Sequence, residues 1–503
     1  MVCQIEIDNL IPQTFHNSDE EYDTTFSTMS SQEADAIKNG THLNDKTSKR
    51  SDGASVFQTS LNVGKMCMGT GTLALPFAAE KGGLFFNAIG LGLIGLWNYY
   101  SANCLLRCLE LLPEIDKVEV NEVKSVDGVE HQIVYGTMDS NHANNKEQGS
   151  VPPPPDGTTT YGAVAWYASG PKGLMVLDLL MLSLFFGLLI AYEVAMQSFI
   201  NDTPLTTGSK SFDLLIPSAI IAIISCAPDM SFLSKFSGMG LLAVGLSFVV
   251  ISWQGFQENG FSGFRSTLKL NRWPASLSAA SSWFGVVVFG YGVVPFVFSF
   301  RNSMANPQQV GLCLQIGLSL VYIGYIVMSN GIWVLFSPDG HVFDGDVLQA
   351  MPDTWISSVV RLLMTFAVAV TAPLIVVPFG ELVEGKIGTD KTQQSSLLKR
   401  IVVRVSFCIV CTLFAEFLGS GFVHIVSFIG CFCVSIAGFV LPPLFIIQLS
   451  NQNKSACKRE FGVDSVLLCD AAVLLLGIIA TIITSTLTFR ELMMKTELEN
   501  AKR

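Results

Sequence analysis

The chain has 503 residues, of which 50% are hydrophobic and only 14% are charged, and its formal net charge is −11. Soluble domains carry roughly 25% charged residues, so a chain this apolar needs lipid as the solvent for much of its surface. No basic patch with interleaved aromatic residues occurs, which argues against nucleic acid as a partner. No Cys, His or acidic residues have metal-ligand spacing beyond the isolated pair Cys408-x-x-Cys411, so we expect no metal and no cofactor.

The first 54 residues form a polar tail with ten acidic and four basic residues. They are rich in Ser and Thr and lack periodic apolar positions, so we expect this tail to be disordered. The tail contains Glu6, Leu10 and Ile11 in an arrangement that resembles an acidic dileucine sorting signal. Such a signal predicts contact with a sorting adaptor and delivery to a vacuole or lysosome, with the plasma membrane as the alternative.

Long apolar runs begin after the tail, each close to the ~20 residues that cross a bilayer as a helix. They predict an all-α integral membrane protein with about eleven transmembrane helices. The transmembrane domain is expected over residues 55–489, followed by a carboxyl-terminal tail at 490–503. The expected spans are 56–79, 84–109, 174–200, 214–227, 238–256, 281–300, 311–336, 355–380, 401–418, 423–448 and 465–489.

A long polar loop, residues 113–172, separates the second and third expected spans. It holds a run of four prolines at 152–155 that favours a stiff polyproline II spacer. The segment 161–170 then predicts a short amphipathic helix at the membrane surface. Lys and Arg are about twice as frequent on one set of loops as on the other, which places the amino terminus and this loop in the cytoplasm.

The first and sixth expected spans are both interrupted. Gly69-Thr70-Gly71 is followed by Pro76, and Gly290-Tyr291-Gly292 is followed by Pro295. Glycine and proline together favour local unwinding of a helix, which lipid does not tolerate unless the freed backbone lines a cavity or binds a polar group. The breaks lie five spans apart, so the second enters the membrane from the opposite side. This spacing predicts an inverted repeat of five plus five helices, one extra carboxyl-terminal helix, and a binding site between the two breaks.

Ionisable side chains inside the spans cost roughly 2.5–3.5 kcal/mol each on insertion scales, so each needs a reason. Lys65 lies one turn before the first break and far from either end of its span. Glu193 lies deep in the third span, whereas Glu381 closes the eighth, where it can reach the membrane surface. These three residues are the candidates for ion coupling.

Four motifs, in the same order along the chain, resemble the amino acid/auxin permease family over about residues 55–489. The segment from Lys65 through Gly69 to Pro76 is similar to the first-helix signature of that family, and 161–170 to the segment before its third helix. Residues 289–295 look like its sixth helix, and 427–445 like its tenth. The resemblance implies the inverted-repeat fold of the amino acid–polyamine–organocation transporters and alternating-access transport of amino acids.

Sodium-coupled members of that family resemble one another in carrying Asn where this chain has Lys65. A Lys at this position looks more like the proton-coupled and vacuolar branches. A fixed ammonium group beside the break also repels a second cation. We therefore expect protons, and not sodium, as the coupling ion.

The mechanism expected from these features has three parts. The freed amide groups of Gly69, Thr70 and Gly71, with the positive end of the helix that follows, hold the substrate carboxylate. Backbone carbonyls over residues 289–292, which comprise Phe289, Gly290, Tyr291 and Gly292, accept its ammonium group. Tyr192 and Tyr291 shape the side-chain pocket, and Glu193 is the first candidate for the coupling proton because burial favours the protonated carboxyl.

Two alternatives remain beside the transporter. An amino-acid sensor of the same fold would signal through the acidic tail. An enzyme is not expected, because the spans contain no facing nucleophile–base pair.

Overall fold

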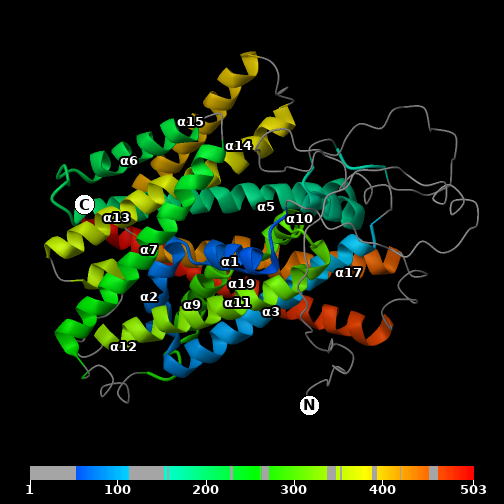
Figure 1. The fold of residues 1–503 in the computed structure, drawn as a ribbon, viewed down its shortest axis with the longest axis horizontal. Helices are drawn as coiled ribbons and strands as arrows, with labels where there is room; N and C mark the ends of the chain where they lie inside the picture. Colours follow the sequence, from blue (N-terminus) through cyan, green and yellow to red (C-terminus); the bar gives the residue numbers. More distant parts are fainter. Residues whose placement is uncertain are drawn as a thin grey trace, which may run out of the picture. The chain divides into compact units, whose positions relative to one another are not determined.

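The computed structural model describes residues 53–112, 152–155, 158–226, 230–260, 262, 271–336, 347–351, 354–387, 394–419, 421–452 and 463–502. The candidate sorting signal, nearly all of the tail and most of the 113–172 loop lie outside these residues. Within them the chain is helical, and the long helices run roughly along a common direction, several of them inclined to it (Figure 1). Seven helices of the described part are long and apolar enough to cross a membrane. The all-helical membrane class is therefore confirmed, while the count of eleven spans and the inverted repeat stay predictions.

A first group of helices contains both interrupted spans. In it α1 lies along α11, α2 lies against α9, and α3 packs on α11. The members are α1 (Val56–Cys67), η1 (Thr70–Ala74), α2 (Leu75–Gly82), α3 (Leu84–Glu110), α9 (Leu277–Gly290), η4 (Val294–Phe296), α10 (Val297–Ser303), η5 (Pro307–Gln309), α11 (Val310–Ile326), η6 (Val327–Gly331) and α12 (Ile332–Phe336).

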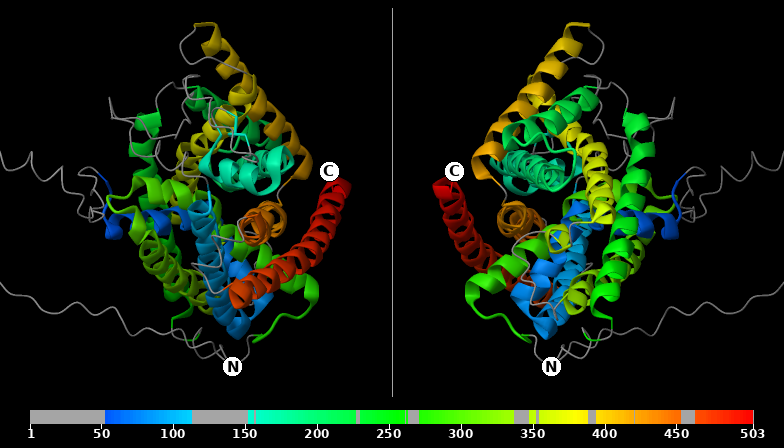
Figure 2. Two further views of the ribbon diagram at one scale, coloured as in Figure 1. Left: turned by 90° about the vertical axis from the view of Figure 1, so that its right-hand side faces the viewer. Right: turned by 90° about the vertical axis from the view of Figure 1, so that its left-hand side faces the viewer.

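A second group packs around α5, which is seen nearly end-on in Figure 2. The members are α5 (Thr160–Asn201), α6 (Lys210–Ser225), α13 (Trp355–Thr371), α14 (Pro373–Ile387) and α15 (Gln394–Leu418). Ion pairs join these helices at one end. Lys386 of α14 lies 2.9 Å from Asp178 of α5, and Glu384 lies 3.5 Å from both Arg400 and Arg404 of α15. Asp178 and Glu384 therefore have charged partners within the protein.

The remaining helices pack between or beside the two groups. α7 packs on α13 and α12, and α16 packs on both α9 and α5. α19 lies against α9 and α17. These connecting elements are α7 (Met230–Asn259), η8 (Val347–Ala350), α16 (Phe422–Ile429), η9 (Gly430–Val434), η10 (Ile436–Val440), α17 (Leu441–Gln452) and α19 (Val463–Lys502).

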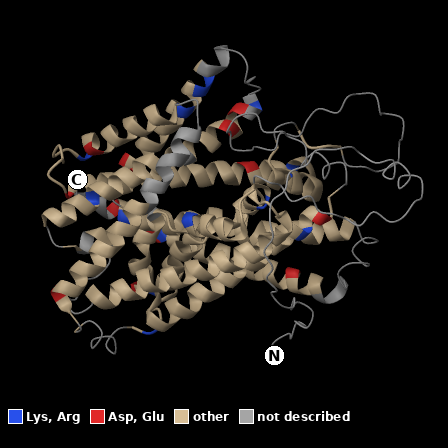
Figure 3. Cartoon of the chain, viewed as in Figure 1, with Lys and Arg blue, Asp and Glu red and all other residues tan. Residues whose placement is uncertain are grey.

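Charge is distributed as a membrane protein requires. Most acidic and basic residues lie at or near helix ends, and the middles of the long helices are largely uncharged (Figure 3). Large apolar side chains, such as Ile223 at 73% and Leu413 at 66% relative exposure, point outward. In water such a surface would be unfavourable, so it fits a lipid environment.

Two segments differ from the expectation. The stretch 161–170 is not an amphipathic surface helix but the first part of α5, set off by a kink at Gly170, whose φ is +67°. Its side chains are nearly all apolar and buried, and the Tyr161 hydroxyl donates to the Ala437 carbonyl at 2.7 Å. The expected tail at 490–503 continues α19 as helix to Lys502.

Candidate functional site

The first break separates α1 from α2. α1 ends at Cys67, and Gly69 is extended with φ −92° and ψ −162° before the chain enters the 3-10 turn η1. The Gly69 carbonyl accepts from the Thr72 amide and hydroxyl at 3.1 and 2.7 Å. In the described part of the chain, the Gly69 amide makes no backbone hydrogen bond outside the helices, and the Gly71 amide lies in the first turn of η1, where N–H groups lack an intrahelical acceptor. These two amides, at the start of η1 and α2, thus remain available to an anionic ligand.

The second break separates α9 from α10. α9 ends at Gly290, and Pro295 lies at the start of the short turn η4. Pro295 has no N–H group, so it cannot donate to the carbonyl of Gly292 three residues before it. The Gly292 carbonyl accepts no hydrogen bond from the described part of the chain. It is therefore a free acceptor at the point where the helix is interrupted.

The two breaks face each other. A Cβ atom on Gly71 would lie 2.7 Å from Cε1 of Phe289, so the Phe289 ring covers Gly71 and leaves no room for a side chain there. A Cβ atom on Gly292 would lie 3.1 Å from the Phe289 carbonyl and 3.4 Å from Val434 of η9. The candidate site thus lies where η1, the end of α9 and η9 come together.

The carbonyls expected to hold an ammonium group are not equivalent. The Phe289 and Tyr291 carbonyls accept from the amides of Gly292 and Val293 at 3.2 and 2.5 Å. The Gly290 carbonyl accepts from the Tyr325 hydroxyl at 2.8 Å. A carbonyl has a second lone pair, but Gly292 alone of the four has both free. This difference makes Gly292 the first candidate to bind a ligand cation.

The two candidate pocket tyrosines have different environments. Tyr291 is fully buried, and its ring lies edge-on to the Tyr325 ring with centroids 5.0 Å apart. A Cβ atom on Gly95 of α3 would lie 3.5 Å from the Tyr291 hydroxyl. Tyr291 therefore packs between α11 and α3. Tyr192 is partly buried on α5.

The candidate coupling residues are dispersed. Lys65 lies half-buried in the last turn of α1, where its positive charge complements the negative end of the helix. Glu193 is completely buried and faces α15, where the Thr412 hydroxyl lies 3.3 Å from its Oε1. Glu381 is partly buried on α14. The structure thus brings Lys65 close to the first break along α1, and Glu193 to the α5–α15 contact.

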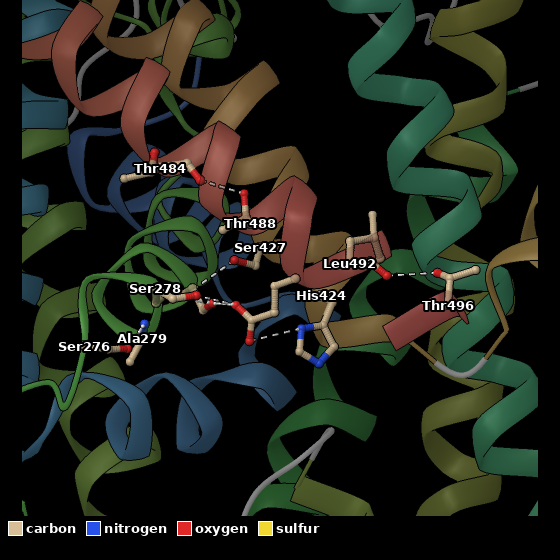
Figure 4. A network of polar contacts seen from close by, with 11 residues as sticks. Ser276, Ser278, Ala279, His424, Ser427, Thr484, Thr488, Leu492 and Thr496 are labelled. Carbon is tan, nitrogen blue, oxygen red and sulfur yellow. Dashed lines mark hydrogen bonds and ion pairs between the residues drawn. The ribbon is translucent and has the colours of Figure 1, made fainter. Parts of the chain in front are cut away.

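A further polar cluster joins the start of α16 to α9 and α19 (Figure 4). His424 Nδ1 lies 3.8 Å from Oε1 of Glu491. The hydroxyls of Ser278 and Ser282 donate to Oε2 of the same carboxylate at 3.3 and 2.5 Å. The His424 ring also lies edge-on to Phe77 of α2 at 5.8 Å. This cluster therefore links four helices. It joins α2, which follows the first break, and α9, which precedes the second break, to α16 and α19.

Sequence reasoning missed Tyr325. It is completely buried in α11, and its hydroxyl lies 2.7 Å from the Cys67 carbonyl and 2.8 Å from the Gly290 carbonyl. The one available signal was general: a Tyr within an apolar span needs a partner for its hydroxyl. The identity of that partner depends on which helices pack together, and the local sequence does not predict it.

Comparison with known proteins identifies a family for this chain. The family model described as transmembrane amino acid transporter protein matches residues 52–124 and 152–486. The chain is also similar to the amino acid transporter ANT1 of Arabidopsis thaliana. The two are 22% identical over 462 residues, covering 86% of this chain and 93% of that protein.

Proposed function

The chain belongs to the transmembrane amino acid transporter family, and we propose that it is a secondary transporter that carries amino acids by alternating access. The substrate binds where the two breaks meet. Its carboxylate accepts from the amides of Gly69 and Gly71, and its ammonium group donates to the Gly292 carbonyl. A zwitterion is thus bound largely by backbone groups, so the side chains around it are left to select among amino acids.

One observation supports this proposal most strongly. Free donors and a free acceptor of the main chain lie at two helix interruptions that are in contact through Gly71 and Phe289. Unpaired backbone groups inside an apolar protein are costly unless a ligand pairs with them. A ligand with one negative and one positive end satisfies both sets together.

Coupling to protons and independence of sodium form the second part of the proposal. The positive charge of Lys65 in the last turn of α1 disfavours a further cation near the first break. Glu193, with a buried carboxyl, is the candidate proton carrier, and Glu381 is the second. The proposed setting is a vacuolar, lysosomal or plasma membrane with the amino terminus in the cytoplasm.

Uptake into proteoliposomes tests the proposal. Purified full-length protein is assayed with a panel of radiolabelled amino acids, with and without an imposed pH gradient, in sodium or in choline chloride. We expect uptake of one or a few amino acids, stimulation by the pH gradient, and equal rates in the two salts. Saturable amino-acid binding without uptake in any condition would favour a sensor of the same fold, and sodium-stimulated uptake would exclude the coupling that we propose.

A further inference from the structure

The carboxyl-terminal ends of two half-helices converge on one side chain of a third helix. α1 ends at Cys67 and α9 ends at Gly290. The carbonyls of these two final residues lie 2.7 and 2.8 Å from the same atom, the hydroxyl oxygen of Tyr325. The Tyr325 hydroxyl therefore links the two breaks at the carboxyl-terminal ends of α1 and α9, where backbone carbonyls are exposed.

The carbonyl ends of two helices give this point a negative electrostatic character, which the ammonium group of Lys65 reduces on the α1 side. The last carbonyls of a helix lack intrahelical donors, and each helix end acts as roughly half a negative charge. Two such ends at one point favour a positive group, and helix ends with unwound carbonyls bind monovalent cations in other transporters. Here the hydroxyl of Tyr325 occupies the point with a single hydrogen shared by two acceptors.

The surroundings hold Tyr325 in this position. Its ring is completely buried and lies edge-on to the ring of Tyr291. Close approach also requires glycine at the end of α9, because a Cβ atom on Gly290 would lie 2.9 Å from the Tyr325 hydroxyl. Packing of the buried ring against Tyr291 and of the hydroxyl against Gly290 therefore fixes the position of the hydroxyl.

We propose that Tyr325 is a positioning residue that clasps α1 to α9, with its hydroxyl in the place where the two helix ends would otherwise bind a monovalent cation. The clasp sets the distance between the two breaks, and it fills the cation position with a neutral donor. The expected effect of Tyr325 on substrate binding rests on the proposed transport function. The occupancy of the cation position by its hydroxyl does not.

Removal of the hydroxyl tests the clasp. Tyr325→Phe keeps the ring and exposes both carbonyls, and Tyr325→Asn adds an amide oxygen and more space. Each is made alone and together with Lys65→Gln, because the Lys65 ammonium repels a cation at the end of α1, and Lys65→Gln alone is the reference for the loss of that charge. The matched control is Tyr322→Phe, one turn earlier in α11, whose hydroxyl lies 3.4 Å from the Ala88 carbonyl of α3 and not from the carbonyls of Cys67 or Gly290. Purified full-length proteins are unfolded thermally in sodium chloride and in choline chloride of equal concentration.

We expect the wild-type protein and Tyr322→Phe to have the same Tm in both salts. At least one Tyr325 variant should have a Tm ~2–4 °C higher in sodium, the shift expected when an ion binds only the folded state. The KM for amino-acid uptake should also rise about tenfold or more in Tyr325→Phe and stay unchanged in Tyr322→Phe.

Folded Tyr325 variants without a sodium-dependent Tm would overturn the proposal. So would failure of both variants to fold beside a folded Tyr322→Phe, because Tyr325 would then be only a packing residue. If the wild-type protein transports no amino acid, the proposed function fails, but the sodium-dependent Tm still decides whether Tyr325 occupies a cation position.

Discussion

At the scale of single residues, the proposed site depends on backbone atoms that two local interruptions release. Glycine permits the interruption and the close contact, as at Gly71 beneath Phe289, and proline removes a donor, as at Pro295 after Gly292. The interruptions themselves are local, and the glycine and proline pattern predicted where they occur, but it did not predict the contact between Gly71 and Phe289. The Tyr325 clasp joins Cys67, Gly290 and Tyr325, which are distant in the chain. No local pattern contains that information.

Glu193 offers a prediction at this scale. Its carboxyl is completely buried against Thr412, and Gln would mimic the protonated form permanently. If Glu193 carries the coupling proton, Glu193→Gln should abolish the dependence of uptake on external pH and preserve exchange of internal for external amino acid. The assay is uptake against pH in proteoliposomes. Glu416→Gln on α15 is the control, and a pH profile of Glu193→Gln identical to wild type would reduce Glu193 to a structural role.

At the scale of helices, α19 is held at both ends by polar contacts. Toward its beginning, Asp470 is nearly completely buried and accepts from Arg107 at 2.7 Å and from the Tyr100 hydroxyl at 2.5 Å. Toward its end, Glu491 contacts α9 and α16 through Ser282 and His424. The apolar pattern predicted this helix, but the partners of its acidic residues depend on which helices lie beside it.

Asp470 therefore anchors α19 to α3. Asp470→Ala leaves the Arg107 guanidinium in a largely apolar region without its carboxylate, a change that typically costs ~3–5 kcal/mol. We expect a Tm lower by several degrees for the purified protein in detergent. Cys469→Ala, at the exposed neighbouring position, should leave the Tm unchanged. An unaltered Tm in Asp470→Ala would show that the ion pair contributes nothing net to stability.

At the scale of the molecule, the segments that flank the two broken helices are joined. The Ala54 amide donates to the Ser303 carbonyl at 2.8 Å, and the Ala305 amide donates to the Ala54 carbonyl at 3.0 Å. A Cβ atom on Gly53 would lie 2.3 Å from the Ala305 amide nitrogen, so this contact requires glycine. The start of α1 and the end of α10 are thus connected outside the site, as the Tyr325 clasp connects the helices within it.

These connections predict that α1 and α10 move as one unit during transport. A disulfide between Ala54→Cys and Met304→Cys, which are paired in the structure, should then leave the rate of amino-acid uptake within about twofold of the reduced protein. Rates before and after reduction provide the measurement. Loss of uptake that is restored by reduction would show that these segments must separate.

The most direct test of the central claim is equilibrium binding of the transported amino acid to Gly71→Val. The Cβ atom of the valine would lie 2.7 Å from the Phe289 ring. A Cβ atom on Gly64 of α1, by contrast, would meet nothing within 4 Å. Because the valine fills the contact between the breaks, we predict a Kd at least ~100-fold weaker, or ~2.8 kcal/mol, for folded Gly71→Val. Gly64→Val should bind like wild type. Wild-type affinity in folded Gly71→Val would contradict a binding site at the junction of the two broken helices.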